Sequence, residues 1–269
     1  MPTTTVGPLL REWRTRRRRS QLELALDTGV SPRHLSFIET GRSRPSPEVV
    51  LALSAKLEVP LRERNRLLLA AGHAPRYAET TFDAPQMETV RAACHRLLDV
   101  LHPYPAVVVN GDWDVVAANA AAGVFVASLP PELREPTPNL FRASLHPDGL
   151  APNLVNFEDW SRHLLAQLRQ LVESSASPRL AALLAEISAY PNLAHIDQSR
   201  LGYDDIELVL PMRYRVGEEE LALFTTVTTF ATAVDVTVGE LAVEMFFPAD
   251  AQTEALLRRW AEESKGAVV

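Results

Sequence analysis

Apolar positions recur at helical spacing through the first 72 residues and again from about residue 86, and the spacing changes to two near the C-terminal end. Five short helices are expected in the first stretch, over 8–19, 21–28, 32–40, 47–56 and 61–71. Residues 73–85 hold two prolines and have no helical period, which is typical of a linker. The pattern therefore predicts a helical domain over residues 1–72, a linker over 73–85 and a second domain over 86–269.

The second stretch mixes helices with strands. Asn110-Gly111 lies between two short apolar runs, and such a turn is the strongest short signal of a β-hairpin. Helices are expected over 86–101, 118–127, 153–172 and 178–190, with a last one after Asp250. Strands are expected over 106–109, 114–117, 206–210, 212–216, 221–230 and 241–247. This order predicts an α+β domain with an antiparallel sheet and helices on one side.

Residues 20–41 predict two short helices joined at a sharp angle by a tight turn. The inward face of the first is expected to consist of Leu22, Ala25 and Leu26. Gly29 suits the positive φ that ends such a helix, and Ser31 followed by Pro32 is a typical helix start. The N-terminal end of the second helix is left exposed, where a helix-turn-helix contacts base edges in the major groove.

This stretch resembles the Cro/repressor-like, XRE-type helix-turn-helix of bacterial regulators. The resemblance covers about residues 7–72 and rests on Gln21, Leu22, Ala25, Gly29–Ser31 and Leu35–Ser46. It implies that the first domain binds double-stranded DNA. Arg33 and His34 are expected to read bases, with Ser36 and Phe37 nearby. The other expected DNA contacts are Gln21, Ser31, Arg42, Arg44, Arg17 and Arg18.

Charge is distributed unevenly along the chain. The net charge is −7, but residues 1–80 hold 14 Lys and Arg against 8 Asp and Glu, a balance of +6. The remaining residues hold 13 against 26, a balance of −13. Phosphate binding needs local positive charge, so the basic first domain favours DNA binding and the acidic remainder argues against a second nucleic-acid surface. For the arginines at 16–19, a solvated charge run is the alternative to phosphate contact.

The order of elements after residue 86 resembles a PAS-like domain. Pro138–Arg142, Leu145–Gly149 and Trp160–Arg169 resemble the ligand-binding region of the MmyB-like regulators. The resemblance implies a transcription regulator whose second domain binds a small, apolar, fatty-acid-like effector. The segment after Gly149 lacks the bulky, basic run that is usual there, so ligand contacts do not carry over residue by residue.

An apolar pocket is expected between the sheet and the helices above it. Its expected lining is Leu164, Leu168, Leu184, Phe224, Phe230, Met245 and Phe246. Thr226, Thr228 or Arg213 could hydrogen-bond a ligand head group or could equally face solvent, because strand residues alternate. A fully packed core made of the same apolar residues is the alternative.

Motifs of enzymes are missing from the sequence. There is no Gly-x-Ser-x-Gly elbow, phosphate-binding glycine loop or Cys-x-x-Cys pair. His95 and His102 share a predicted helix face with Asp99, but about 10 Å along the axis separates the histidines, too far for one ion to bind both. Asp204 and Asp205 are adjacent on an expected strand and point to opposite faces. We therefore expect no enzyme activity, no metal and no cofactor.

The sequence also indicates the compartment and the partners of the protein. No apolar run approaches the roughly 20 residues that a membrane helix needs, and the arginine-rich N-terminus lacks the apolar part of a signal peptide. The single cysteine, Cys94, fits a reducing compartment. The expectation is a cytoplasmic homodimer that binds an inverted repeat. The alternative is a DNA-binding protein whose second domain holds no ligand and only dimerises or binds a protein partner.

Overall fold

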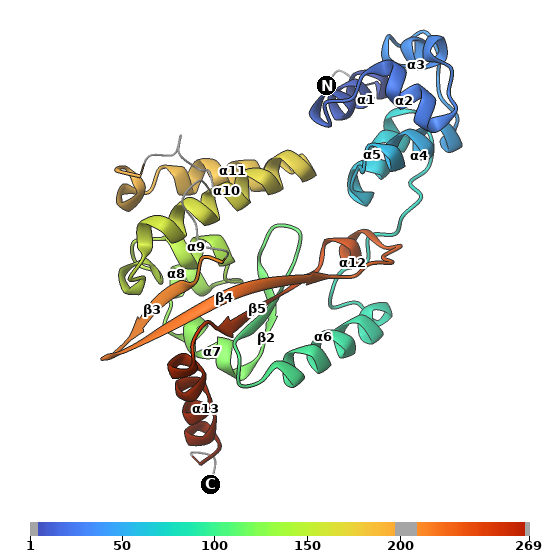
Figure 1. Ribbon diagram of the computed structural model, residues 1–269. Coiled ribbons are helices and arrows are strands. Elements are labelled where there is room, and N and C mark those ends of the chain that lie inside the picture. The colour runs from blue at the N-terminus through green and yellow to red at the C-terminus, as the bar shows by residue number, and fades with distance from the viewer. Residues whose placement is uncertain (1–4, 197–208, 267–269) are drawn as a thin grey trace. The chain divides into compact units, whose positions relative to one another are not determined.

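The computed structural model describes residues 5–196 and 209–266 (Figure 1). The chain divides into two compact units. The first unit comprises Met1–Thr81 together with Ala231–Gly239, and the second unit comprises Phe82–Phe230 and Glu240–Val269. The first unit therefore includes a segment from far along the chain. Among the described helices, none is long and apolar enough to cross a membrane.

Helices make up the first unit before residue 72: α1 (Val6–Arg16), α2 (Gln21–Thr28), α3 (Pro32–Glu39), α4 (Pro47–Lys56) and α5 (Leu61–Ala70). Side-chain caps set their starts. Ser20 and Glu23 cap each other's backbone amides at α2, and Ser31 accepts a hydrogen bond from the amide of His34 at α3. Gly29 has a φ of 69°, which ends α2 and opens the turn into α3. The five-helix domain expected from the sequence is confirmed.

The packed face of α2 differs from the expected one. Leu24 and Ala25 are each 1% exposed, whereas Leu22 and Leu26 are 58% and 72% exposed. The inward positions recur at 21, 24, 25 and 28, which is helical spacing with a polar glutamine at its start. The expected stripe of Leu22, Ala25 and Leu26 is corrected accordingly, because Gln21 faces inward to reach a buried partner described below.

Residues in the expected linker have partners in the segment 231–239. Asp235 accepts hydrogen bonds from the amide and the hydroxyl of Thr80, at 3.1 and 2.7 Å. The amide of Val236 donates to the carbonyl of Ala78 at 2.8 Å. Val236 begins the short helix α12 (Val236–Glu240), which Asp235 caps through the amides of Thr237 and Val238. These bonds tie the loop between two late strands to the end of the first unit.

The second unit is built on an antiparallel sheet of five described strands in the order β2-β1-β5-β4-β3. The strands are β1 (Ala106–Val109), β2 (Val115–Ala118), β3 (Met212–Val216), β4 (Glu219–Thr229) and β5 (Ala242–Pro248). Asn110 closes the expected first hairpin by accepting hydrogen bonds from the amides of Asp112 and Asp114, both at 2.9 Å. The predicted α+β class is confirmed. Asp204, Asp205 and residues 206–208 of the expected strand 206–210 lie outside the described residues.

Helices cover both faces of the sheet (Figure 1). The larger core lies under α9 (Leu140–Leu145), α10 (Phe157–Ser175) and α11 (Pro178–Ser188). On the opposite face, Cys94 and Leu98 of α6 (Glu88–Leu101) pack on β1 and β5. The expectation of helices on one side only was wrong: helices pack on both sides of the sheet, and β1 is buried on both of its faces. The remaining helices are α7 (Ala120–Ala127), α8 (Pro131–Arg134) and α13 (Ala251–Gly266), and short 3-10 turns lie at Pro85–Met87, Ala151–Asn153 and Pro191–Leu193.

Candidate nucleic-acid interface and apolar cavity

The start of α3 presents polar and aromatic side chains. Ser31 and Arg33 are exposed, and His34, Ser36 and Phe37 are half-buried. The guanidinium carbon of Arg33 lies 5.3 Å from the centroid of the Phe37 ring, and that of Arg42 lies 5.9 Å from the same centroid. Cation–π attraction therefore holds two cations beside one aromatic ring. The structure brings together Arg33, Phe37 and Arg42 from the residues expected to contact DNA.

The turn after α3 places Arg42. Gly41 has a φ of 73°, which reverses the chain at the end of the helix. The amides of Arg42 and Ser43 then both donate to the carbonyl of Phe37, at 2.8 and 3.1 Å. Within the described ranges, no carboxylate pairs with the guanidinium of Arg33 or Arg42. Both positive charges are therefore available to a polyanion.

Gln21 has a partner inside the protein. Its Nε2 donates to Oε2 of Glu39 at 2.7 Å, and Arg14 donates to both oxygens of the same carboxylate at 2.6 and 2.9 Å. Glu39 is 7% exposed. Burial alone would raise the pKa of Glu39, but the hydrogen bonds from Arg14 and Gln21 outweigh it and lower the pKa. The side chain expected to hold a phosphate thus belongs to the buried network that joins α1, α2 and α3.

Arg44 also has hydrogen-bond partners inside the protein. Its Nε donates to the carbonyl of Ala71, and its NH2 donates to the carbonyl of Gly72 at 2.7 Å. A cation at the last carbonyls of a helix is favoured by the helix dipole and by the carbonyls that lack partners there. The structure therefore places Arg44 as the link between the loop after α3 and the end of α5.

The arginines after α1 divide into two groups. The Nε of Arg17 donates to the carbonyl of Leu57 at 2.9 Å, and its guanidinium lies 5.4 Å from the Trp13 ring. Arg17 thus connects α1 to the end of α4 rather than pointing into solvent. Arg18 is exposed, with a φ of 53°. Of the two arginines proposed from the sequence, the side chain of Arg18 is the one presented on the surface.

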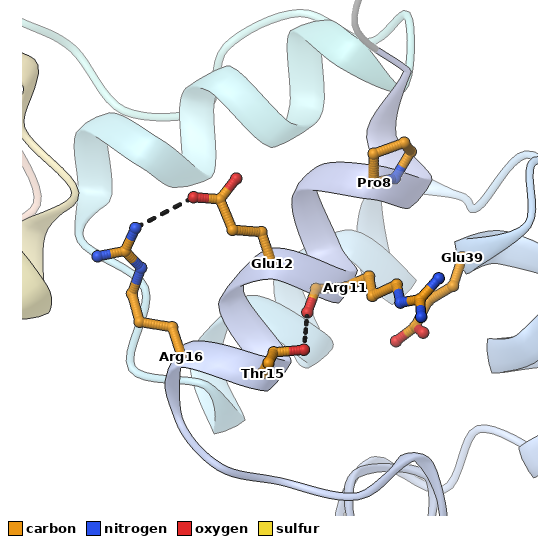
Figure 2. Close-up of a pocket in the computed structure, with 6 residues that line it drawn as sticks. All are labelled: Pro8, Arg11, Glu12, Thr15, Arg16 and Glu39. Atoms are coloured by element: carbon orange, nitrogen blue, oxygen red, sulfur yellow. Dashed lines mark hydrogen bonds and ion pairs between the residues drawn. The ribbon is translucent and has the colours of Figure 1, made fainter.

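A hollow of about 610 Å³ runs along α1 (Figure 2). It is lined by Pro8, Arg11, Glu12, Thr15, Arg16 and Glu39. Arg16 pairs with Glu12 at 3.1 Å, and the Thr15 hydroxyl donates to the carbonyl of Arg11 at 2.8 Å. Figure 2 shows the side chain of Arg11 directed toward Glu39. The hollow is wide open to solvent and lined by charged groups, so it does not have the enclosed, apolar form of a small-molecule site.

The second unit contains an apolar cavity of about 60 Å³ between the sheet and helices α7 and α9. Its wall is formed by Pro105, Val107, Val115, Ala122, Phe125, Val126, Leu129, Pro138, Leu140, Ala143, Ser144, Leu150, Met212, Leu223 and Phe246. Ser144 supplies the one side-chain hydroxyl in this wall. Because small-molecule sites usually enclose about 300–1,000 Å³, the cavity in this conformation is smaller than a bound metabolite needs.

Of the residues expected to line a pocket, Phe246 lines this cavity. Leu164 and Leu168 are buried in the packed core, and Leu184 is half-buried against it. Met245 and Phe230 lie on the opposite face of the sheet, packed toward α6, and Phe224 stacks on Phe247. The expected lining is corrected, because β5 turns Phe246 toward the cavity and its neighbour Met245 away from it. Thr226 and Thr228 are exposed, and Arg213 pairs with Glu220 at 2.5 Å.

Sequence reasoning did not single out Glu244. This carboxylic acid lies in β5, is 3% exposed, and its Oε2 has no hydrogen-bond partner among the described residues. Burial raises the pKa of Glu244 to about 8. A lone acid inside the apolar run 241–247 was the available signal, because a charged residue is almost never fully buried without a partner.

Two family models match the chain. A helix-turn-helix model matches residues 10–64, and a model described as the MmyB-like transcription regulator ligand binding domain matches residues 90–259. Among solved structures, the chain is similar to one titled "Structure of an RNA-binding Light-Oxygen-Voltage Receptor", at 10% sequence identity and a TM-score of 0.28. That match covers 98% of this chain and 63% of the other, so the chain spans less than two thirds of that protein's length. No curated protein matches the chain.

Proposed function

The chain belongs to the family of MmyB-like transcription regulators, and from that premise we propose that α3 reads a specific DNA sequence while the second unit binds an apolar effector. The helix-turn-helix and the ligand-binding domain together make the protein a transcription regulator with a ligand-binding domain. The matched families are not enzyme families. The observation that carries the DNA-reading proposal is the cluster of Arg33, Phe37 and Arg42 at the exposed side of α3.

Base reading is assigned to the first half of α3. Arg33 is exposed, and an arginine that bonds guanine in bidentate fashion contributes about 1–3 kcal/mol of discrimination. His34 and Ser36 supply further polar groups, and the edge of the Phe37 ring suits the methyl group of thymine. The contact with Phe37 restrains Arg33 before DNA arrives, which reduces the entropy lost on binding.

Phosphate contact is assigned to Arg42, Arg18 and the helix start at Ser31. Arg42 and Arg18 present charge at the surface, and the Arg33 amide at the start of α3 can donate to a phosphate oxygen. Gln21, Arg44 and Arg17 are given a supporting role instead, because their described hydrogen bonds hold the helices that carry the contacts.

We assign a dimeric binding mode. A single helix-turn-helix contacts only a few base pairs, so specific binding normally uses two copies on an inverted repeat with half-sites about one helical turn apart. An inverted repeat mirrors the two-fold symmetry of a homodimer. Sedimentation that shows only monomer at concentrations saturating an operator would contradict this part of the proposal.

The effector would act through the hairpin of β4 and β5. Leu223 of β4 and Phe246 of β5 line the cavity, and the loop that joins these strands bonds to Thr80 and Ala78 of the first unit. A ligand that bound more tightly to one arrangement of these strands would shift the population of the loop's arrangements as well. The spacing of two DNA-reading helices in a dimer is the property that such a shift would change.

The effector is proposed to be a small apolar molecule with a fatty-acid-like chain. The wall of the cavity is almost wholly apolar, which supports such a chain. Its volume of about 60 Å³ would have to increase when the chain enters. The helices α7 and α9 form one side of the cavity and would have to move for this to happen.

The small volume favours a second candidate function as well. In this alternative the second unit holds no ligand and serves as a dimerisation or protein-partner module. Native mass spectrometry of the full chain separates the two. A co-purified small molecule supports the ligand-binding proposal, whereas a bare chain with no thermal shift on addition of acyl compounds supports the partner module.

A further inference from the structure

Glu244 shares a face of the sheet with two residues that line the cavity. In the antiparallel register of β1 and β5 it is directly opposite Val107, and Phe246 lies two residues further along its own strand. Val107 and Phe246 both line the cavity. Opposite residues share a face, with Cβ atoms about 4.5–5.5 Å apart, and residues two apart on a strand also share a face. The carboxyl group of Glu244 is therefore on the cavity side of the sheet, next to two residues of its wall.

Nothing described around Glu244 compensates its carboxyl group for the loss of water on burial. The side chain is 3% exposed, and Oε2 has no hydrogen-bond partner within the part of the chain that the structure describes. Burial is the sole cause that shifts its pKa, to about 8, so no neighbouring described charge offsets the loss of water. A polar group in such a position normally has a partner, and one that lacks a partner marks a strained or functional position.

We propose that Glu244 is the polar anchor of the effector site, and that the effector is an apolar chain ending in a hydrogen-bond donor, an amine or an alcohol, rather than a free carboxylate. The proposal rests on the proposed function, in which the second unit binds a small apolar molecule. The cavity must enlarge to admit such a chain, and Val107 and Phe246 are wall residues on the same face of the sheet as Glu244. Their displacement brings the carboxyl group into contact with the end of the ligand.

The chemistry of a lone buried acid selects among head groups. An ammonium group nearby lowers the pKa of Glu244, so the acid releases its proton to solvent and pairs with the cation as a carboxylate in an apolar environment, where the attraction is strong. A hydroxyl group donates one hydrogen bond to the same oxygen. A free carboxylate would bury its own negative charge beside a neutral acid that offers one hydrogen bond and no positive charge, which costs more. The donor-bearing head is therefore favoured.

The test compares three probes with the same chain length on the full-length protein. Octylamine, octan-1-ol and octanoate are titrated by calorimetry at pH 7 into wild type, Glu244→Gln and Glu218→Gln. Glu244→Gln keeps the size and an acceptor oxygen but cannot ionise when a cation binds. Glu218 lies in the exposed turn before β4, so Glu218→Gln makes the same chemical replacement without touching the cavity.

We expect the wild type to bind octylamine most tightly and octanoate most weakly. In Glu244→Gln the affinity for octylamine should fall by about tenfold or more, since a charge-assisted hydrogen bond becomes a neutral one. The affinity for octan-1-ol should change far less, and Glu218→Gln should match wild type throughout. Because Gln adds a buried amide, circular dichroism of each variant verifies the fold before titration.

The other outcomes separate this inference from the proposed function. Octanoate binding that is tightest in wild type and unchanged in Glu244→Gln would overturn the inference and leave the apolar effector in place. Equal affinity of wild type and Glu244→Gln for octylamine would also overturn the inference. The same holds if Glu244→Gln and Glu218→Gln lost octylamine affinity equally. Failure of all three probes to bind wild type would contradict the inference and the ligand-binding proposal together.

Discussion

Asp235 accepts two hydrogen bonds from Thr80, a residue 155 positions earlier in the chain. One comes from the Thr80 amide at 3.1 Å and the other from its hydroxyl at 2.7 Å. The same carboxylate caps α12 through the amides of Thr237 and Val238. The loop of a hairpin whose strands line the cavity is thereby attached to the DNA-binding unit, which is the physical basis of the proposed coupling.

The first prediction concerns this attachment. Thr80→Val removes the hydroxyl donor and leaves the amide, so it should weaken the attachment by about 1 kcal/mol. Hydrogen exchange of the full chain should then speed up both around residues 78–80 and around 235–238. Thr81→Val, at an exposed neighbouring position, is the matched control and should change neither segment. Faster exchange near residue 80 alone would show that the loop is held by other contacts.

The second prediction concerns base reading. Arg33→Ala should reduce affinity for the preferred sequence by about 1–3 kcal/mol and relax the preference at one base pair. Arg18→Ala should weaken all sequences alike and lower the salt dependence of binding by about one phosphate contact. Fluorescence anisotropy at several salt concentrations measures both effects. If Arg33→Ala altered neither affinity nor preference, the assignment of α3 as the base-reading element would be wrong.

The third prediction separates support from contact. Arg44→Ala removes the donors to the carbonyls of Ala71 and Gly72, so it should lower the stability of the first unit by about 1–2 kcal/mol. The salt dependence of DNA binding by the folded fraction should stay at the wild-type value. A salt dependence that falls by one phosphate contact would return Arg44 to the role first expected from the sequence.

The fourth prediction follows from the lowered pKa of Glu39. A carboxyl whose folded pKa lies below its ordinary value of 4.5 stabilises the fold above that pH, and the contribution is lost as pH falls through the lower folded pKa. Glu39→Gln should therefore flatten the loss of stability on acidification and lower stability at pH 7, by up to about 3–5 kcal/mol for a broken buried pair. Urea denaturation across pH measures this, with the exposed Glu132→Gln as control. If Glu39→Gln lost stability on acidification as steeply as wild type does, this prediction would be wrong.

The fifth prediction uses the opposite shift at Glu244. An acid whose folded pKa is raised to about 8 destabilises the fold increasingly as pH rises from 4.5 toward 8, because the unfolded chain ionises first. Glu244→Gln should thus gain stability over wild type as pH rises through that range, by a few kcal/mol at about pH 8. Thermal unfolding at a series of pH values checks it. A difference between the two proteins that does not vary with pH would mean that Glu244 is not held neutral.

The helices of the first unit followed from local signals. Ser31, Pro32 and Gly29 act within one turn of the residues that they cap, so their effect is visible in sequence. Which face of α2 packs inward could not be seen in the sequence, because Gln21 turns inward to bond a carboxylate 18 positions away. The partners of Arg44 and Arg17 lie 27 and 40 residues away, and only the packed fold brings such groups together.

The antiparallel sheet was predictable, but the cavity was not. Alternation identifies β5 as a strand without saying which alternate residues face the larger core, so Met245 and Phe246 were both expected in the pocket. The docking of residues 231–239 in the first unit carries no local signal at all. Glu244 did have a local signal, because it is an acidic residue within an apolar run. Its position beside the cavity could be recognised only from the strand register that pairs it with Val107.

Selection of duplexes from a random pool by the full-length protein tests the central claim most directly. We predict enrichment of an inverted repeat by wild type, with affinity that falls steeply as salt rises and a preference that Arg33→Ala relaxes. Wild-type protein that enriches no sequence, and whose affinity for duplex DNA is weak and insensitive to salt, would contradict it.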